Sequence, residues 1–283
     1  MVRASEGQCI RGYASQNSLK GGTEVERIPK IIHYCWFGRS ELPELAVKCI
    51  ESWKLHLPDY EIVRWDEDSF DIESNLFVRQ AYASKKYAFV SDYVRLHALY
   101  TQGGIYMDTD VQVLKTLDPF LKHEAFSGFE TLRTIPTAVI GAQAGSPVIR
   151  DFLSYYENRA FIKPDGNMDI TTNVKIITEY CVSRGFVPDN RYQVFEGFAL
   201  YPKDVFCPLE WSPDKSKIAD RPIPEESCTI HHFAGSWLSE KEIRRSKSFL
   251  WRRFGRQIGF GLRMTRTLLG DKNYSRLKQK YGS

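Results

Sequence analysis

Apolar residues follow two different periods along the first half of the chain, and their order predicts strands interleaved with helices. The run "IPKIIHYCWFG" is apolar and rich in β-formers, which predicts a first strand ending at Gly38, and the alternating run "YEIVRW" predicts a second. Between them, apolar side chains recur at helical spacing from Leu45 to Leu57, and Pro58 ends that helix.

The same pattern extends to the middle of the chain. "LFVRQAYASKK" and "AFVSDYVRLHALYTQ" predict two helices, the second ending at Gly103–Gly104, and "IYMDTDVQVL" predicts a strand, a carboxylate corner and a strand. Further strands are expected at 125–130, 137–142, 192–200 and 228–233, a helix at 146–159 and a loop at 160–173. Strands that alternate with helices are typical of a doubly wound α/β fold, in which ligands collect at the carboxyl ends of strands.

Composition places the chain among ordinary globular proteins. Its 283 residues are 42% hydrophobic and 26% charged, enough for one large α/β domain or two small ones. No run of about eighteen apolar residues predicts a membrane span. Residues 1–27 are polar, lack the apolar centre of a signal peptide and are expected to be a disordered leader. The six scattered cysteines contain no CxxC pair, which favours free buried thiols and a cytoplasmic protein.

The net charge of +4 is unevenly distributed. Residues 241–283 contain thirteen lysines and arginines and two acidic residues, a charge of +11, which leaves −7 for the rest of the chain. Arginines alternate there with aromatic and aliphatic residues, which predicts a basic amphipathic tail on an anionic membrane surface. Packing of a C-terminal helix on the domain is the alternative, and nucleic acid is the less favoured partner.

The carboxylates of Asp108 and Asp110 are the first candidates for chemistry. In an extended segment both point to one side, with Thr109 opposite, and such a pair suits Mg²⁺ or Mn²⁺. A calcium-binding EF-hand is excluded, because it would need Gly and Glu where Val113 and Pro119 stand. An aspartyl-phosphate phosphatase and a solvated surface turn remain alternatives. So does a binding protein that uses the pair to contact a sugar or calcium.

The stretch "SDYVRLHALYTQGGIYMDTDV", together with "IPKIIHYCWFG" before it and "HHFAGSW" near the end, resembles the DXD glycosyltransferases of family 32. The resemblance covers roughly residues 28–240 and extends to the glucosyltransferase domains of large bacterial toxins. It implies one GT-A domain, a Rossmann-like α/β fold with a mixed central sheet flanked by helices. It also implies metal-dependent transfer of a hexose, with retention, from a nucleoside-diphosphate sugar, a UDP-hexose being favoured. The implied acceptor is a glycan or a lipid-linked saccharide.

The resemblance also implies roles for the residues of the central block. Asp110 matches the family's direct metal ligand, and Asp108 matches the carboxylate that reaches the ribose and the metal. Asp92 and Arg95, three apart on one helix face, match the residues that hold the donor sugar and its phosphates. Tyr106 falls at the aromatic position beside the DXD. An arginine and a metal both suit the negative charge of a leaving diphosphate.

Residues outside that block complete the expected site. Trp36 matches the family's base-stacking platform, with a core tryptophan as the alternative. Adjacent histidines on a strand face opposite sides, so only one serves the metal, and His231 fits the family position better than His232. Ser236 and Trp237 resemble the loop that covers the diphosphate.

Two further polar residues are weaker candidates for the site. Asn173 lies in a region that borders the donor and acceptor sugars in the family. Glu130 ends a predicted strand and is either a site residue or an ordinary surface carboxylate. The resemblance suggests synthesis of bacterial capsule or another surface polysaccharide, with the protein docked peripherally on the inner face of the plasma membrane.

Overall fold

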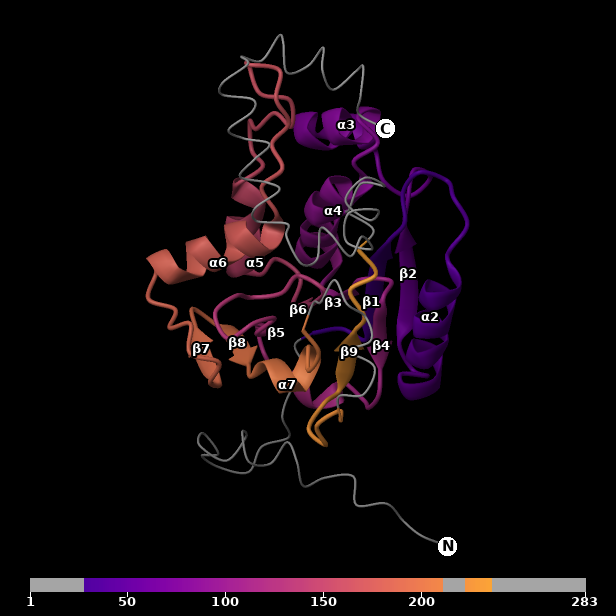
Figure 1. Cartoon of the computed structure of the whole chain (residues 1–283), viewed down its shortest axis with the longest axis vertical. Coiled ribbons are helices and arrows are strands. Elements are labelled where there is room, and N and C mark those ends of the chain that lie inside the picture. Colours follow the sequence, from indigo (N-terminus) through magenta and orange to yellow (C-terminus); the bar gives the residue numbers. More distant parts are fainter. Residues whose placement is uncertain (1–27, 211–221, 236–283) are drawn as a thin grey trace, which may run out of the picture. The chain divides into compact units, whose positions relative to one another are not determined.

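The computed structural model describes residues 28–210 and 222–235 of the chain. The predicted leader and the basic tail lie outside the described residues. Seven strands form one sheet in the order β2-β1-β3-β6-β5-β8-β7, and β4 and β9 form a separate pair (Figure 1). Within the described ranges, no helix has the length and apolar character needed to cross a bilayer.

The elements follow one another in the alternation that the sequence predicts. The strands are β1 Ile31–Cys35, β2 Glu61–Trp65, β3 Gly104–Met107, β4 Val111–Val113, β5 Ala125–Gly128, β6 Val139–Ala142, β7 Gln193–Phe195, β8 Phe198–Tyr201 and β9 Thr229–His231. The α-helices are α2 Glu44–His56, α3 Leu76–Ala83, α4 Tyr87–Gln102, α5 Pro147–Ser154, α6 Asn173–Ser183 and α7 Lys203–Phe206. Two short 3-10 helices are η1 Ile72–Ser74 and η2 Asp118–Phe120.

The large sheet is mixed, with most of its strands running one way. β1 is parallel to both β2 and β3, and β5 is parallel to β8. β6 lies antiparallel between β3 and β5, and β7 is an antiparallel edge strand on β8. The carboxyl ends of β1, β3, β5 and β8 therefore meet at one edge of the sheet. The mixed α/β architecture flanked by helices is confirmed.

Both faces of the sheet are covered, because side chains alternate along each strand. On β3, Tyr106 packs into a core with residues of α3, α4, α5 and α6, whereas Ile105 and Met107 pack into a second core with residues of α2 and α7. Trp53 of α2 donates a hydrogen bond from Nε1 to the carbonyl of Val111 over 2.7 Å, which fixes β4 beside α2.

Three sequence expectations differ from the structure. Residues 192–200 form two strands, β7 and β8, because the chain turns through positive φ at Glu196 and Gly197. The helix expected to reach residue 159 ends at Ser154. The expected loop at 160–173 carries one isolated bridge between Ile162 and Met168, and it is followed by a helix, α6, that the sequence patterns did not predict.

The turn from α4 into β3 depends on two glycines. Gly103 has a φ of 69° and closes the helix with a 3.0 Å bond from its N–H to the carbonyl of Leu99. Gly104 has a φ of +105°, and a Cβ there would lie 2.6 Å from the carbonyl oxygen of Ile31 in the neighbouring strand. The strand that ends in the two aspartates can approach β1 only because this position has no side chain.

We expect Gly104→Ala to lower the free energy of unfolding by about 2–3 kcal/mol, from backbone strain and contact with a fixed carbonyl. Gly145→Ala is the matched control, because Gly145 also has a positive φ, +72°, but a Cβ added there would meet no atom within 4 Å. It should cost about 1 kcal/mol. Urea unfolding of both variants measures the difference, and equal losses would show that the contact with Ile31 is unimportant.

Candidate functional site

Asp108 and Asp110 lie at the carboxyl end of β3, on a turn rather than on an extended segment. The N–H of Asp108 donates a 2.9 Å hydrogen bond to the carbonyl of Ala138, which extends the pairing of β3 with β6 by one residue. The N–H of Val111 then donates to the carbonyl of Asp108 over 3.0 Å, which closes a turn. The expectation that simple strand alternation aligns the two carboxylates is therefore wrong. The turn brings them together instead, and it redirects the chain into β4.

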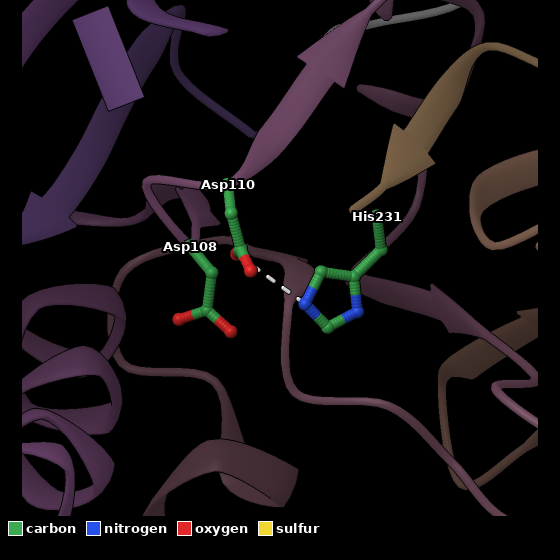
Figure 2. Close-up of side chains that lie close together, drawn as sticks. All are labelled: Asp108, Asp110 and His231. Carbon is green, nitrogen blue, oxygen red and sulfur yellow. Dashed lines mark ion pairs between the residues drawn. The ribbon is translucent and has the colours of Figure 1, made fainter. Parts of the chain in front are cut away.

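The side chains of Asp108, Asp110 and His231 converge (Figure 2). One ligand atom from each lies within 4.8 Å of the others. His231 comes from β9, which pairs with β4 so that His231 stands opposite Val111. Its Nε2 lies 3.3 Å from Oδ1 of Asp110. The other oxygen, Oδ2 of Asp110, accepts a 2.7 Å hydrogen bond from the N–H of Ala234.

Only one of the two adjacent histidines faces the carboxylates, as alternation along a strand predicts. The ring Nε2 of His232 lies 3.0 Å from Oε1 of Gln112, away from this cluster. The structure thus places His231, and not His232, beside the two carboxylates, and its role as a metal ligand stays a prediction.

Asp110 and His231 are held as an ion pair. Burial raises the pKa of Asp110, but the hydrogen bond and charge of His231, with the Ala234 amide, outweigh burial and lower it below its ordinary value. For His231, burial lowers the pKa, while Asp110 and the buried Cys207 thiol outweigh burial and raise it well above its ordinary value. The negative charge of Asp110 is therefore maintained in a largely buried setting.

Arg95, buried on α4, connects the donor-side residues to this cluster. Its Nη2 lies 3.1 Å from Oδ1 of Asp92 and its Nη1 lies 3.4 Å from Oδ1 of Asp108. Nη1 also donates a 2.6 Å hydrogen bond to the carbonyl of Thr137. The guanidinium lies 4.6 Å from the ring centre of Tyr106, whose hydroxyl donates to Oδ1 of Asp108 over 2.9 Å. Four of the five residues predicted from the central block are thus in one network of ion pairs and hydrogen bonds.

Asn173 joins the network from the first turn of α6. Its Nδ2 donates a 2.7 Å hydrogen bond to the backbone carbonyl of Asp92, and its backbone N–H lies 3.4 Å from Oδ2 of the same residue. The hydroxyl of Tyr156 donates to Oδ1 of Asn173 over 2.5 Å. Asn173 therefore fixes Asp92 in place. Sequence reasoning missed Tyr156, because no local pattern marks a tyrosine that meets its partner only through the fold.

The buried carboxyl of Asp92 gives a pH dependence that can be measured. Burial, opposed by the charge of Arg95, raises the pKa of Asp92 from 3.8 to about 6. Because the folded state binds this proton more tightly than the unfolded state, the contribution of Asp92 to stability is lost as pH rises between these values. The free energy of unfolding of the wild type relative to Asp92→Asn should fall by about 3 kcal/mol over that window.

Urea unfolding of both proteins from about pH 4 to about pH 7 measures this difference. Asp68→Asn is the control, because the hydrogen bond from Arg39 lowers the pKa of Asp68 on the exposed surface. The free energy of unfolding of the wild type relative to Asp68→Asn should depend only weakly on pH, and it should rise rather than fall with pH. A difference between wild type and Asp92→Asn that stays constant with pH would contradict the assignment.

The remaining predicted residues lie around this centre or outside the described part of the chain. Trp36 directly follows β1 at the same edge of the sheet, is half-buried, and donates from Nε1 to the carbonyl of Ser40 over 2.7 Å. Its role as a base platform stays a prediction. Ser236 and Trp237 lie outside the described residues. His33, by contrast, is fully buried, and its Nε2 lies 2.7 Å from the Gly103 carbonyl, so it packs inside the sheet.

The donor set of the cluster fits a hard divalent cation. Two carboxylates and one imidazole are ligands that Mn²⁺ accepts, and carboxylates with additional phosphate or water oxygens suit Mg²⁺. The neighbouring Arg95 places a positive charge 3.4 Å from Oδ1 of Asp108, so the site combines two carboxylates, an imidazole and a guanidinium.

Comparison with known proteins agrees with this chemistry. Residues 43–127 match the family model described as the glycosyltransferase sugar-binding region containing the DXD motif. Inositol phosphoceramide mannosyltransferase 3 of Schizosaccharomyces pombe is 38% identical over 130 residues, 43% of this chain and 35% of the relative. Mannosyl phosphorylinositol ceramide synthase CSH1 of Saccharomyces cerevisiae is 34% identical over 142 residues, 46% of this chain and 34% of the relative.

The chain thus spans about a third of the length of these curated relatives. Among solved structures, the PaToxG glycosyltransferase has a TM-score of 0.43 and 20% identity, covering 56% of this chain and 69% of that one. The galactosyltransferase LgtC has a TM-score of 0.39 and 12% identity, covering 78% and 99%. Residues 43–127 thus resemble the DXD-containing sugar-binding region of glycosyltransferases, and this similarity covers less than half of the chain.

Proposed function

We propose that this protein transfers a hexosyl group from a nucleoside-diphosphate sugar to a hydroxyl group of a lipid headgroup or lipid-linked saccharide, with a divalent cation at Asp108, Asp110 and His231. The observation that carries the proposal is the convergence of these three ligands beside the buried Arg95. A solvated surface turn needs neither a buried guanidinium nor a histidine from a distant strand.

The acceptor class rests on the relatives' names. Both curated relatives are named for sugar transfer that involves inositol phosphoceramide, a lipid. Those names do not support the expected role in bacterial capsule synthesis, so we replace that expectation with a lipid acceptor. A lipid acceptor also fits docking of the basic residues 241–283 on an anionic membrane surface, which we retain as part of the proposal.

The residues divide the reaction between them. The bond between the anomeric carbon and the diphosphate oxygen breaks, and its electron pair leaves with the diphosphate. The acceptor oxygen forms the new bond to carbon, and its proton passes to the released diphosphate. Arg95 stabilises the charge that develops on the leaving group, and a bound cation supplies Lewis-acid stabilisation to the same oxygens. Asp92, held by Asn173, accepts hydrogen bonds from the donor sugar.

Calorimetric titration tests the donor site first. UDP and GDP are each titrated into the full chain with Mn²⁺ and again with EDTA, and release of nucleotide from UDP-hexoses and GDP-hexoses is then followed. We expect one nucleotide to bind only with the metal, and its sugar to be hydrolysed slowly without acceptor. We favour UDP as the nucleotide. The relatives are named as mannosyltransferases, so the titration with GDP is needed as well. Absence of binding by both nucleotides would overturn the transferase proposal.

A further inference from the structure

Glu130 lies at the same edge of the sheet as the candidate metal cluster. β5 continues past Gly128 through a 3.0 Å bond from the N–H of Phe129 to the carbonyl of Tyr201. Glu130 follows, and its own N–H closes a turn to the carbonyl of Thr134 over 2.8 Å. Since β3 and β5 run in the same direction on either side of β6, Glu130 and Asp108 emerge at neighbouring positions of one edge.

Glu130 lies near the cluster without belonging to it. The pKa of Glu130 is raised, mainly by burial; the charge of Asp108 adds to this shift and the charge of His231 opposes it. Glu130 therefore lies within electrostatic reach of both residues. Yet it is not one of the three converging ligands, and within residues 28–210 and 222–235 its carboxylate makes no hydrogen bond or ion pair. A half-buried carboxylate beside a charged cluster is therefore available to contact a ligand bound there.

We infer that Glu130 is a further catalytic residue, whose carboxylate contacts the transferred sugar and stabilises the positive charge of its transition state. This inference rests on the proposed function. As the bond to the diphosphate lengthens, the sugar ring acquires oxocarbenium-like positive charge. Arg95 and a bound cation would balance the leaving group, and Glu130, which follows β5 at the same edge, would balance the charge on the sugar. Glu130 forms no covalent bond in this scheme.

The experiment compares Glu130→Gln and Glu130→Asp with the wild type in the full chain. Glu51→Gln, an exposed carboxylate on α2, is the control. Metal-dependent binding of the nucleoside diphosphate is measured by calorimetry, and kcat and KM are measured for hydrolysis of the nucleotide sugar. We expect the Kd of Glu130→Gln for the diphosphate to stay within about twofold of wild type, because the diphosphate lacks the sugar, while kcat falls roughly 100-fold. Glu130→Asp should recover part of the loss.

Two results would overturn the inference. An unchanged kcat in Glu130→Gln would show that the carboxylate does not act on the transition state. A fall in kcat that is matched by weaker metal-dependent diphosphate binding would show instead that Glu130 only positions His231. Failure of the proposed function looks different, because the wild type itself would then neither bind a nucleoside diphosphate nor release it from any nucleotide sugar.

Discussion

Asp110→Asn should weaken metal-dependent nucleotide binding by roughly 100-fold or more, since even residues that only support metal ligands contribute 10–100-fold to metal affinity. The substitution keeps the size of the side chain and an oxygen that can still accept from the Ala234 amide. It removes the charge that faces His231 and one anionic ligand of the proposed cation. The largest loss should therefore appear in metal-dependent binding, while loss of the pair with His231 should also lower stability.

Calorimetric titration with Mn²⁺ measures this effect, and thermal unfolding of the same samples reports on folding. Asp59→Asn serves as the matched control, because Asp59 is an exposed carboxylate whose partner is Lys30, at 2.7 Å. It should bind nucleotide like the wild type. If Asp110→Asn also bound nucleotide with unchanged, metal-dependent affinity, the cluster would not be the metal site.

Arg95→Ala should lower the free energy of unfolding by about 3–5 kcal/mol, the usual cost of removing one partner from a buried ion pair. Arg95 is 5% exposed and lies against two carboxylates and a backbone carbonyl. Its removal leaves the carboxylates of Asp92 and Asp108 without the guanidinium that both of them contact. The exposed pair of Arg39 with Asp68 is the control, and Arg39→Ala should leave stability nearly unchanged because solvent screens this pair.

Arg95→Lys separates charge from geometry. A lysine keeps the positive charge, but its single ammonium cannot reproduce the fork that reaches Asp92, Asp108 and the Thr137 carbonyl together. We expect the lysine variant to lose less stability than the alanine variant, yet to release nucleotide from the donor at well below the wild-type rate. Urea unfolding and the hydrolysis assay report the two effects. A lysine variant with wild-type turnover would show that charge alone is sufficient.

The stretch from α4 to Asp108 was predictable from the sequence because its information is local. Helical periodicity places Asp92 and Arg95 on one face, and glycines at 103 and 104 mark the end of that helix. The structure confirms that this helix delivers both residues to the carboxylate corner, over a separation of fewer than twenty positions. Interactions at such short range depend mainly on backbone periodicity, which the order of residues specifies directly.

Local patterns could not supply the rest of the site. Alternation on a strand showed that only one of two histidines faces a given side, but the pairing of β9 with β4 decided that His231 meets Asp110. The same holds for Asn173 and Tyr156, whose hydrogen bonds to each other and to Asp92 depend on how α6 packs beside α4.

Residue order thus predicted the α/β class, the helix that carries Asp92 and Arg95, and the carboxylate pair. Only the fold brought about the turn that aligns the two carboxylates, the approach of His231 to them, and the position of Glu130 at the same edge of the sheet. The physical reason is that strand pairing and core packing bring together side chains distant in the chain, and residue periodicity carries no record of which distant elements will meet.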